Sequence, residues 1–163
     1  MAATLQKLDF IHVSPFRPED LDALLVIEEE VHASPWSRAS YEDIICLDSI
    51  FIWVARIQNE LVGYMLFQKA EEEIELHTIG VTGRYQRQGI GKRLMEKLMT
   101  EAKTFGTEGI SLQVRVSNTP AQKLYLSFGF VNVGLRKKYY QDNQEDALVM
   151  RKKLTSHEGL NFV

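Results

Sequence analysis

The sequence predicts one α+β domain in which helices cover both faces of a mixed, mostly antiparallel sheet. Three strand-like segments follow one another almost without interruption, at residues 50–57, 61–70 and 73–81. A helix ending near Phe105 then separates the last of these from another strand at residues 110–116. Strands joined by tight turns pair antiparallel, whereas a strand–helix–strand crossover makes its two strands parallel. We therefore expect a parallel βαβ unit in the centre of an otherwise antiparallel sheet.

Size and composition fit a soluble globular domain. The chain has 163 residues, of which 45% are hydrophobic and 25% charged, and a formal net charge of -3. That charge gives no general attraction to nucleic acid or anionic lipid, and no segment approaches the length of a membrane span. We expect a monomeric cytosolic protein that binds neither nucleic acid nor membrane. Its single domain should occupy residues 1–154, followed by a tail at residues 155–163.

Hydrophobic spacing defines the elements of the first half. Alternating apolar residues predict a strand at residues 8–14. Pro18 is a favourable first residue for the helix that follows, and four apolar residues share one face of it: Leu21, Leu24, Leu25 and Val31. Pro35 interrupts this pattern before a second short helix, expected at residues 38–47. The polar turn at residues 58–60 joins the next two strands into a hairpin.

Helix and strand alternate in the second half. Apolar residues recur at intervals of four in the first helix, at Ile90, Leu94, Leu98 and Ala102. After the strand at residues 110–116, Asn118 and Pro120 open another helix with apolar residues at helical spacing. Residues 129–135 and 145–154 are expected as two closing strands.

Gly89 and Gly91 lie between a strand and the N-terminus of the long helix. The free N–H groups of a first helical turn, together with the helix dipole, make an anion site. Glycines let a phosphate approach the backbone closely, and Arg87, Lys92 and Arg93 add positive charge. The segment therefore indicates a phosphate-binding loop, although glycines that only shape a turn remain an alternative.

Two common phosphate-binding motifs do not fit this segment. A Walker loop requires a glycine where Gln86 stands. A dinucleotide-binding fingerprint requires a small residue where Leu94 stands. The pattern that fits is Q/R-x-x-G-x-G/A, at residues 86–91.

This hexapeptide resembles the acetyl-coenzyme A (acetyl-CoA) pyrophosphate loop of the GNAT acetyltransferase superfamily, and the order of elements matches that fold. The RimI group within it, which acetylates the N-terminal alanine of a small-subunit ribosomal protein, is similar over about residues 18–154. Four segments carry that resemblance: residues 27–37, 85–94, 112–130 and 136–150. It implies acetyl-CoA as co-substrate, direct transfer in a ternary complex and a protein N-terminus as acceptor.

The resemblance also implies which residues bind the co-substrate. The strand ending at residues 79–81 pairs with the pantetheine arm, the loop holds the pyrophosphate, and the start of the next helix contacts the pantetheine or the thioester. The implied residues are Ile79, Gly80, Val81, Arg87, Gln88, Gly89, Ile90, Gly91, Lys92 and Asn118. Asn118 is equally compatible with a plain helix cap.

Tyr125 is implied as the catalytic acid that protonates the departing thiolate. A phenol with a pKa of about 10 can protonate a thiolate whose conjugate acid has a pKa of about 8.5 as charge develops. The alternative is a core aromatic residue beside Phe128 and Phe130.

The general base is less clear from the residues, because the family's glutamate falls at Gln113, whose amide does not titrate usefully. We predict Glu75 as its replacement. On an alternating strand Glu75 shares a face with His77 and Ile79. His77 is the second candidate, and a solvated acidic edge is the third interpretation of this segment.

The expected function is therefore acetylation of a protein N-terminal amine by a GNAT enzyme. Two alternatives stay open: acetylation of a small amine or a protein lysine, and CoA binding without catalysis. No metal is expected, because Cys46 and the four histidines lack ligand spacing.

Overall fold

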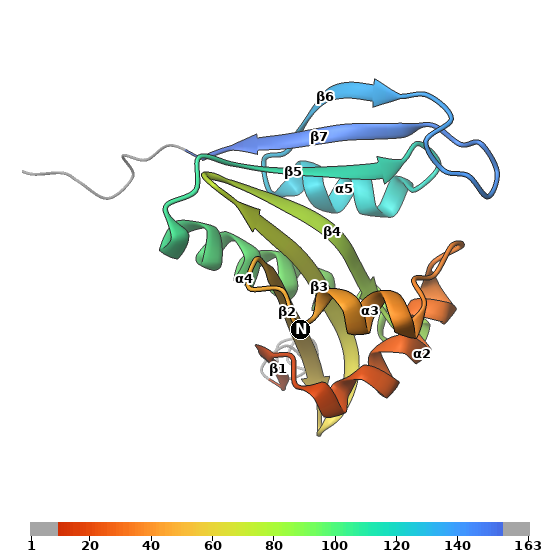
Figure 1. The fold of residues 1–163 in the computed structure, drawn as a ribbon, viewed down its shortest axis with the longest axis vertical. Coiled ribbons are helices and arrows are strands. Elements are labelled where there is room, and N and C mark those ends of the chain that lie inside the picture. The colour runs from red at the N-terminus through yellow and green to blue at the C-terminus, as the bar shows by residue number, and fades with distance from the viewer. Residues whose placement is uncertain (1–9, 155–163) are drawn as a thin grey trace, which may run out of the picture.

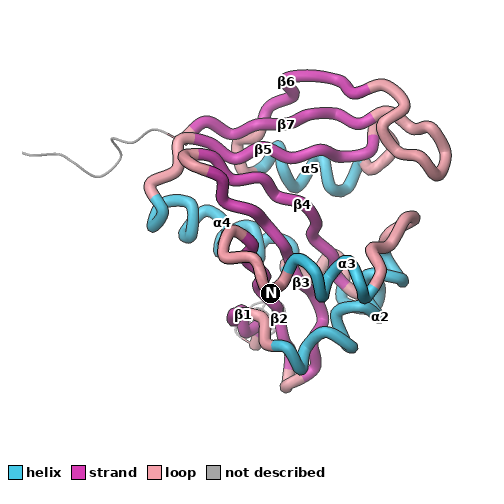
Figure 2. The backbone as a smooth tube through the Cα atoms, viewed as in Figure 1, coloured by secondary structure: helices cyan, strands magenta, loops and turns pink. Residues whose placement is uncertain are grey.

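The computed structural model describes residues 10–154 and contains the predicted order of elements (Figures 1 and 2). The strands are β1 (Ile11–Pro15), β2 (Ile50–Ile57), β3 (Glu60–Ala70), β4 (Glu73–Val81), β5 (Gly109–Arg115), β6 (Val131–Arg136) and β7 (Ala147–Lys153). The helices are η1 (Pro18–Asp20), α2 (Leu21–Val31), α3 (Arg38–Ile44), η2 (Gly83–Tyr85), α4 (Ile90–Phe105) and α5 (Thr119–Ser127). The expected tail and the first two residues of the expected strand at 8–14 lie outside the described residues.

One seven-stranded sheet has the order β1-β2-β3-β4-β5-β7-β6. Each neighbouring pair is antiparallel except β4 and β5, which are parallel and joined by α4. This confirms the predicted α+β fold with a central parallel βαβ unit. Within residues 10–154, no helix is long and apolar enough to cross a membrane.

Two hydrophobic cores lie on opposite faces of the sheet, which confirms helices on both faces. One core is built on α4 and includes Ile90, Leu94, Leu98, Tyr125 and Phe130. The other lies under α2 and α3 and includes Leu24, Ile27, Tyr41, Tyr64 and Leu66. The helix spacing identified in the sequence therefore marks the buried faces of α2 and α4.

The parallel pairing of β4 with β5 is short. It joins Glu73–Leu76 to Gly109–Leu112 and then ends. Beyond it β4 stays paired with β3, and β5 stays paired with β7. The two strands start side by side and separate towards their C-terminal ends (Figure 1). The sheet therefore has an opening at its centre, with an unpaired strand edge on each side.

A β-bulge at His77 marks the place where the strands separate. Phe67 on β3 lies opposite Leu76, but the preceding residue, Leu66, lies opposite Thr78, so that His77 is an extra residue on β4. A bulge bends and twists its strand. This accounts for β4 turning away from β5 immediately after their last shared pair.

The bulge corrects one prediction about β4. Alternation places Ile79 on the face of Glu75 and His77, but the extra residue reverses the faces beyond it. Ile79 packs against the core built on α4, whereas Thr78 contacts His32 at the end of α2. Glu75 and Ile79 therefore lie on opposite faces of the sheet.

A buried carboxylate fixes α2 and the segment after it against β3. Glu28 is 1% exposed, and it accepts hydrogen bonds from the hydroxyls of Tyr41 and Tyr64 and, at 3.0 Å, from the backbone N–H of Trp36. Burial raises the pKa of both tyrosines, which therefore remain protonated donors. A buried charge is tolerated only when it is satisfied in this way.

Candidate active site

Two adjoining cavities occupy the opening between β4 and β5. The larger, the loop cleft, has a volume of about 470 Å³ and lies between the end of β4, the loop before α4, and α5. The smaller, the aromatic groove, has a volume of about 350 Å³ and lies among the segment after α2, β5 and the loop between β6 and β7. The cavities meet at residues that line both: His32, Ile79, Asn118, Ala121 and Tyr125.

The loop before α4 presents its backbone N–H groups to the loop cleft. The first hydrogen bond of α4 runs from the N–H of Arg93 to the carbonyl of Gly89 at 3.0 Å. In the described part of the chain, the N–H groups of residues 87–92 have no backbone or side-chain acceptor. Gly89, the residue that caps α4, has a φ of 89°, which glycine adopts without strain. Free amides at a helix N-terminus bind anions.

The edge of β4 forms the opposite wall of the loop cleft. Ile79, Gly80 and Val81 line it, and within residues 10–154 they pair with no strand except β3. Position 80 requires a glycine for a steric reason, since a Cβ there would lie 2.8 Å from the ring of Tyr64. This edge can accept an extended ligand as an additional strand.

The structure gathers nearly all the residues that sequence comparison implied for co-substrate binding. Those lining the loop cleft are Ile79, Gly80, Val81, Arg87, Gly89, Ile90, Gly91, Lys92 and Asn118. Gln88 belongs to the same loop but does not line the cleft, and its side chain donates to the carbonyl of Arg84 at 3.2 Å. Asn118 caps α5 by accepting from the N–H of Ala121 at 3.2 Å, so its predicted capping role is confirmed.

Tyr125 lies on α5 where the two cavities meet, and it is 6% exposed. Burial, followed by the proximity of Tyr140, raises the pKa of its hydroxyl. The side chain therefore stays neutral and keeps a proton to donate. It also packs against Phe130 in the core, so the catalytic and core interpretations of this residue are compatible.

Arg115 on β5 holds one wall of the aromatic groove in place. Its guanidinium contacts both carboxylate oxygens of Asp142 at 3.0 and 3.1 Å, and it lies 3.8 Å from the ring centre of Tyr140. Both contacts bind the β6–β7 loop to β5. On the other side, Glu28 holds the N–H of Trp36. The groove is thus framed by two anchored loops.

Gln113 lines the aromatic groove but is already engaged. Its amide oxygen accepts a hydrogen bond from the hydroxyl of Tyr139 at 3.1 Å. An amide that positions a loop tyrosine in this way has a structural use at position 113. It offers no group that could accept a proton near neutral pH.

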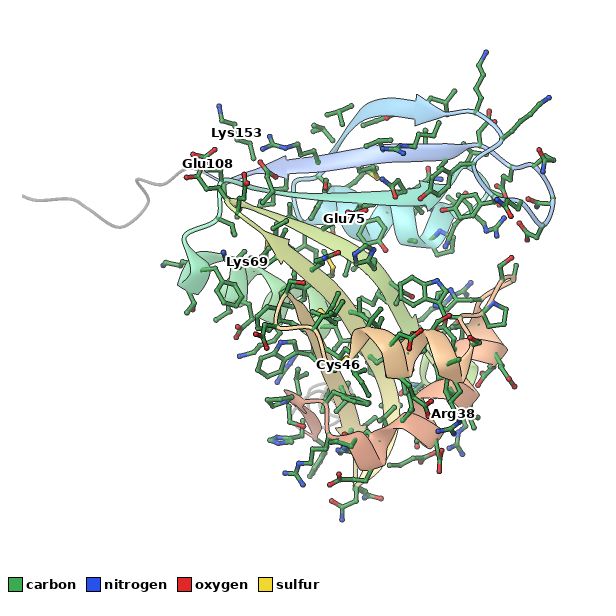
Figure 3. The ribbon with its side chains drawn as sticks, viewed as in Figure 1. Arg38, Cys46, Lys69, Glu75, Glu108 and Lys153 are labelled. Atoms are coloured by element: carbon green, nitrogen blue, oxygen red, sulfur yellow. The ribbon has the colours of Figure 1, made fainter. Side chains whose placement is uncertain are left out.

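The structure does not bring Glu75 to the site. Glu75 lines neither cavity, and it lies in the stretch where β4 and β5 are still paired, opposite Ser111 (Figure 3). Its role as base stays a prediction. His77 does line the aromatic groove, with its Nε2 3.0 Å from the amide oxygen of Gln68.

Sequence reasoning did not single out His32, Glu28 or Arg115. His32 and Glu28 are one helical turn apart, which is a weak signal, since the same spacing is common on solvated helix faces. Arg115 carried no signal, because its acidic partners lie about 27 residues further along the chain and meet it only in the folded protein. In residues 10–154, no group of three histidine, cysteine, aspartate or glutamate side chains could hold a metal ion.

An anion-binding helix N-terminus, an unpaired strand edge and an adjoining groove together define a group-transfer enzyme that uses an extended phosphate-bearing co-substrate. Residues 21–130 match the Acetyltransferase (GNAT) family, and the chain belongs to this family.

Two bacterial proteins and a plant protein illustrate the relationship. The putative [ribosomal protein bS18]-alanine N-acetyltransferase of Bacillus subtilis is 34% identical over 85% of this chain and 92% of its own length. The crystal structure of the ribosomal-protein-S18-alanine N-acetyltransferase from Escherichia coli is 32% identical, with a TM-score of 0.84, and covers 93% of this chain and 99% of that chain. Arabidopsis thaliana NAA60 in complex with acetyl-CoA shares the fold at 20% identity, with a TM-score of 0.79 and coverage of 88% and 98%.

Gly89→Val should weaken acetyl-CoA binding roughly tenfold or more, because a left-handed conformation costs an ordinary residue about 1–2 kcal/mol. The loop would relax and misplace its free amides. Isothermal titration calorimetry would give the dissociation constant.

Gly106→Val is the matched control, since Gly106 also has a positive φ, of 65°, but ends α4 at its far end. It should cost similar stability and leave binding unchanged. Equal affinities in folded Gly89→Val and wild-type protein would reduce Gly89 to a turn residue.

Proposed function

We propose that this enzyme transfers the acetyl group of acetyl-CoA to the α-amino group of a protein N-terminus, with the N-terminal alanine of ribosomal protein bS18 as its substrate. The observation that carries the proposal is the junction of the two cavities at Tyr125. A thioester lying in the loop cleft and an amine entering through the aromatic groove would meet there. The names of the bacterial relatives support this choice of acceptor.

The co-substrate is proposed to bind in three parts. The pyrophosphate accepts hydrogen bonds from the free amides of residues 87–92 and is neutralised in part by Arg87 and Lys92. The pantetheine arm pairs with the edge of β4 at residues 79–81. The acetyl group then reaches the junction beside Asn118.

The reaction is proposed to be one direct transfer within a ternary complex. The amine nitrogen attacks the thioester carbonyl carbon, the C–N bond forms, and the C–S bond breaks. The sulfur leaves as a thiolate and takes the proton of the Tyr125 hydroxyl, which the nearby solvent restores. The amine loses one proton, which ends in solvent and so replaces the proton that solvent gave to Tyr125, and the products are an amide and the free thiol of CoA.

The acceptor's pKa favours an N-terminus over a lysine. An α-amine has a pKa of about 7.7–8.0, so a useful fraction is neutral at pH 7, whereas a lysine amine titrates near 10.4. Deprotonating the lysine would cost about 3 kcal/mol more at 1.36 kcal/mol per pKa unit. A site without a glutamate at position 113 suits the more acidic amine. We also infer that the enzyme works as a monomer in the cytosol.

Acetylation assays on two peptides, one with a free N-terminal alanine and one with a blocked α-amine and a free lysine, test this function. With acetyl-CoA present, a peptide with N-terminal alanine should be acetylated at its α-amine at least tenfold faster, in kcat/KM, than a peptide whose α-amine is blocked and whose lysine is free. Mass spectrometry would locate the acetyl group. Transfer to polyamines or lysines alone would favour the small-amine or lysine alternative, and binding without transfer to any amine would favour the non-catalytic one.

Tyr125→Phe should lower kcat on the order of 10²-fold, which is the lower range for losing a general acid. Acetyl-CoA affinity should change little, because the lost interaction forms only as the thiolate departs. Steady-state kinetics and calorimetry on the same preparation separate the two quantities. A variant with wild-type turnover would leave Tyr125 with its core-packing role alone.

A further inference from the structure

The aromatic groove holds few groups able to accept the proton that the amine must lose. Gln113 does not titrate, and Arg115 is a permanent cation. Glu28 accepts three hydrogen bonds and is 1% exposed, so its oxygens are occupied and screened from an incoming amine. Among the groove residues, this leaves the two histidines, His32 and His77, as side chains whose neutral imidazole can accept a proton.

His32 lies at the junction and His77 does not. His32 follows directly after α2 and lines both the loop cleft and the aromatic groove, together with Tyr125. His77 lines only the groove, beside the ring of Trp36. A base must reach the nitrogen that attacks the thioester, and that atom has to stand where the two cavities meet. Position therefore favours His32.

The surroundings of Nε2 favour one tautomer of His32. Nε2 lies 3.0 Å from the hydroxyl oxygen of Thr78 and 3.7 Å from a carboxylate oxygen of Glu28. That carboxylate accepts the hydroxyl protons of Tyr41 and Tyr64, so it is an acceptor and favours a hydrogen on Nε2. We therefore place the hydrogen on Nε2 and the lone pair on Nδ1.

Nδ1 of His32 is exposed to solvent. No hydrogen bond within residues 10–154 involves this atom. Every buried side-chain nitrogen or oxygen among these residues has a partner, so Nδ1 is not buried, and the side chain is 30% exposed. An accessible lone pair on a residue that lines both cavities is the arrangement that proton transfer requires.

We propose that Nδ1 of His32 is the general base, accepting the proton from the substrate α-amino nitrogen as its bond to the acetyl carbon forms. The proposal rests on the acetyl transfer described above and names the group that replaces the missing glutamate. In the protonated ring, Nε2–H donates to Thr78. It lies 3.7 Å from the buried carboxylate of Glu28, which faces the positive charge of the ring. The proton passes to solvent when product leaves.

Burial keeps His32 neutral, and of the two charges that act on it only Glu28 stabilises its protonated form. Burial lowers its pKa, Glu28 on the same helix raises it, and Arg115 across the opening lowers it. The other titratable groups that line the aromatic groove are His77 on β4, Tyr125 on α5, and Tyr139 and Tyr140 in the loop beyond β6. With its pKa below the ordinary histidine value, His32 is a free base at pH 7.

His32→Gln tests the proposal, because a glutamine nitrogen can replace Nε2 as donor to Thr78 but cannot accept a proton. At pH 8, kcat with saturating peptide should fall 10²–10⁴-fold, the usual contribution of a general base, while acetyl-CoA affinity is retained. His12→Gln, on exposed β1, is the matched control and should behave as wild type. A kcat within twofold of wild type in His32→Gln would overturn the proposal.

The pH dependence separates a base from a structural residue. Protonation removes the base from wild type as the pH falls through the pKa of His32, which burial places below the ordinary histidine value, so the ratio of wild-type to His32→Gln turnover should shrink towards acid pH. A purely structural role would give a ratio independent of pH, and that result would also overturn the proposal. A loss of the same size and pH dependence in Glu75→Gln, with none in His32→Gln, would assign the base to Glu75.

Nitrogen-15 NMR of the wild-type histidines gives a readout that needs neither a variant nor a substrate. The neutral ring of His32 should show its hydrogen on Nε2 and a lone pair on Nδ1, and its pKa should lie below the ordinary histidine value. The opposite tautomer would contradict the proposal even if the enzyme acetylates N-termini. Conversely, a failure of the wild type to acetylate any α-amine would refute the proposed function while leaving this tautomer measurement intact.

Discussion

The early end of the β4–β5 pairing is the constraint on which the rest of the molecule depends. Two parallel strands in continuous register would leave no space between them, and their edges would satisfy each other. Here pairing stops after Leu76 and Leu112, and the bulge at His77 turns β4 aside. The opening receives the N-termini of both α4 and α5, each of which follows one of the two separating strands. Their dipoles make it a favourable place for an anionic co-substrate.

The two cavities in the opening differ in whether backbone or side chains form their walls. Backbone forms the loop cleft: free amides at residues 87–92, a strand edge at residues 79–81, and glycines where a side chain would obstruct. Side chains form the aromatic groove, and each wall is anchored by a charge, Glu28 on one side and Arg115 on the other. This division suits the chemistry. The co-substrate is always the same molecule, so backbone groups can bind it. The acceptor has to be selected, and side chains on the loops can do this.

The sequence was sufficient for the fold and for the residues that line the loop cleft, but not for the arrangement around β4 and the aromatic groove. Helix spacing and strand order are local patterns, and so is the glycine loop, whose strand–loop–helix context fixes its geometry. The bulge at His77 is different, because an extra residue in a ladder leaves no mark on the alternation of one strand. Strict alternation therefore placed Ile79 on the same face as Glu75, whereas the two residues lie on opposite faces of the sheet. The tyrosine hydroxyls that satisfy Glu28 come from α3 and β3, so a run of three glutamates in the sequence could not reveal that one of them is buried.

Hydrogen–deuterium exchange measured with and without saturating acetyl-CoA tests the role of this opening most directly. If the co-substrate completes the interrupted sheet, exchange should slow strongly at residues 79–81 and 87–92. The outer edge strand β6, which also has an unpaired side, should exchange at the same rate in both samples. Unchanged exchange at residues 79–81 in the saturated enzyme would contradict the account, because the strand edge would then play no part in binding.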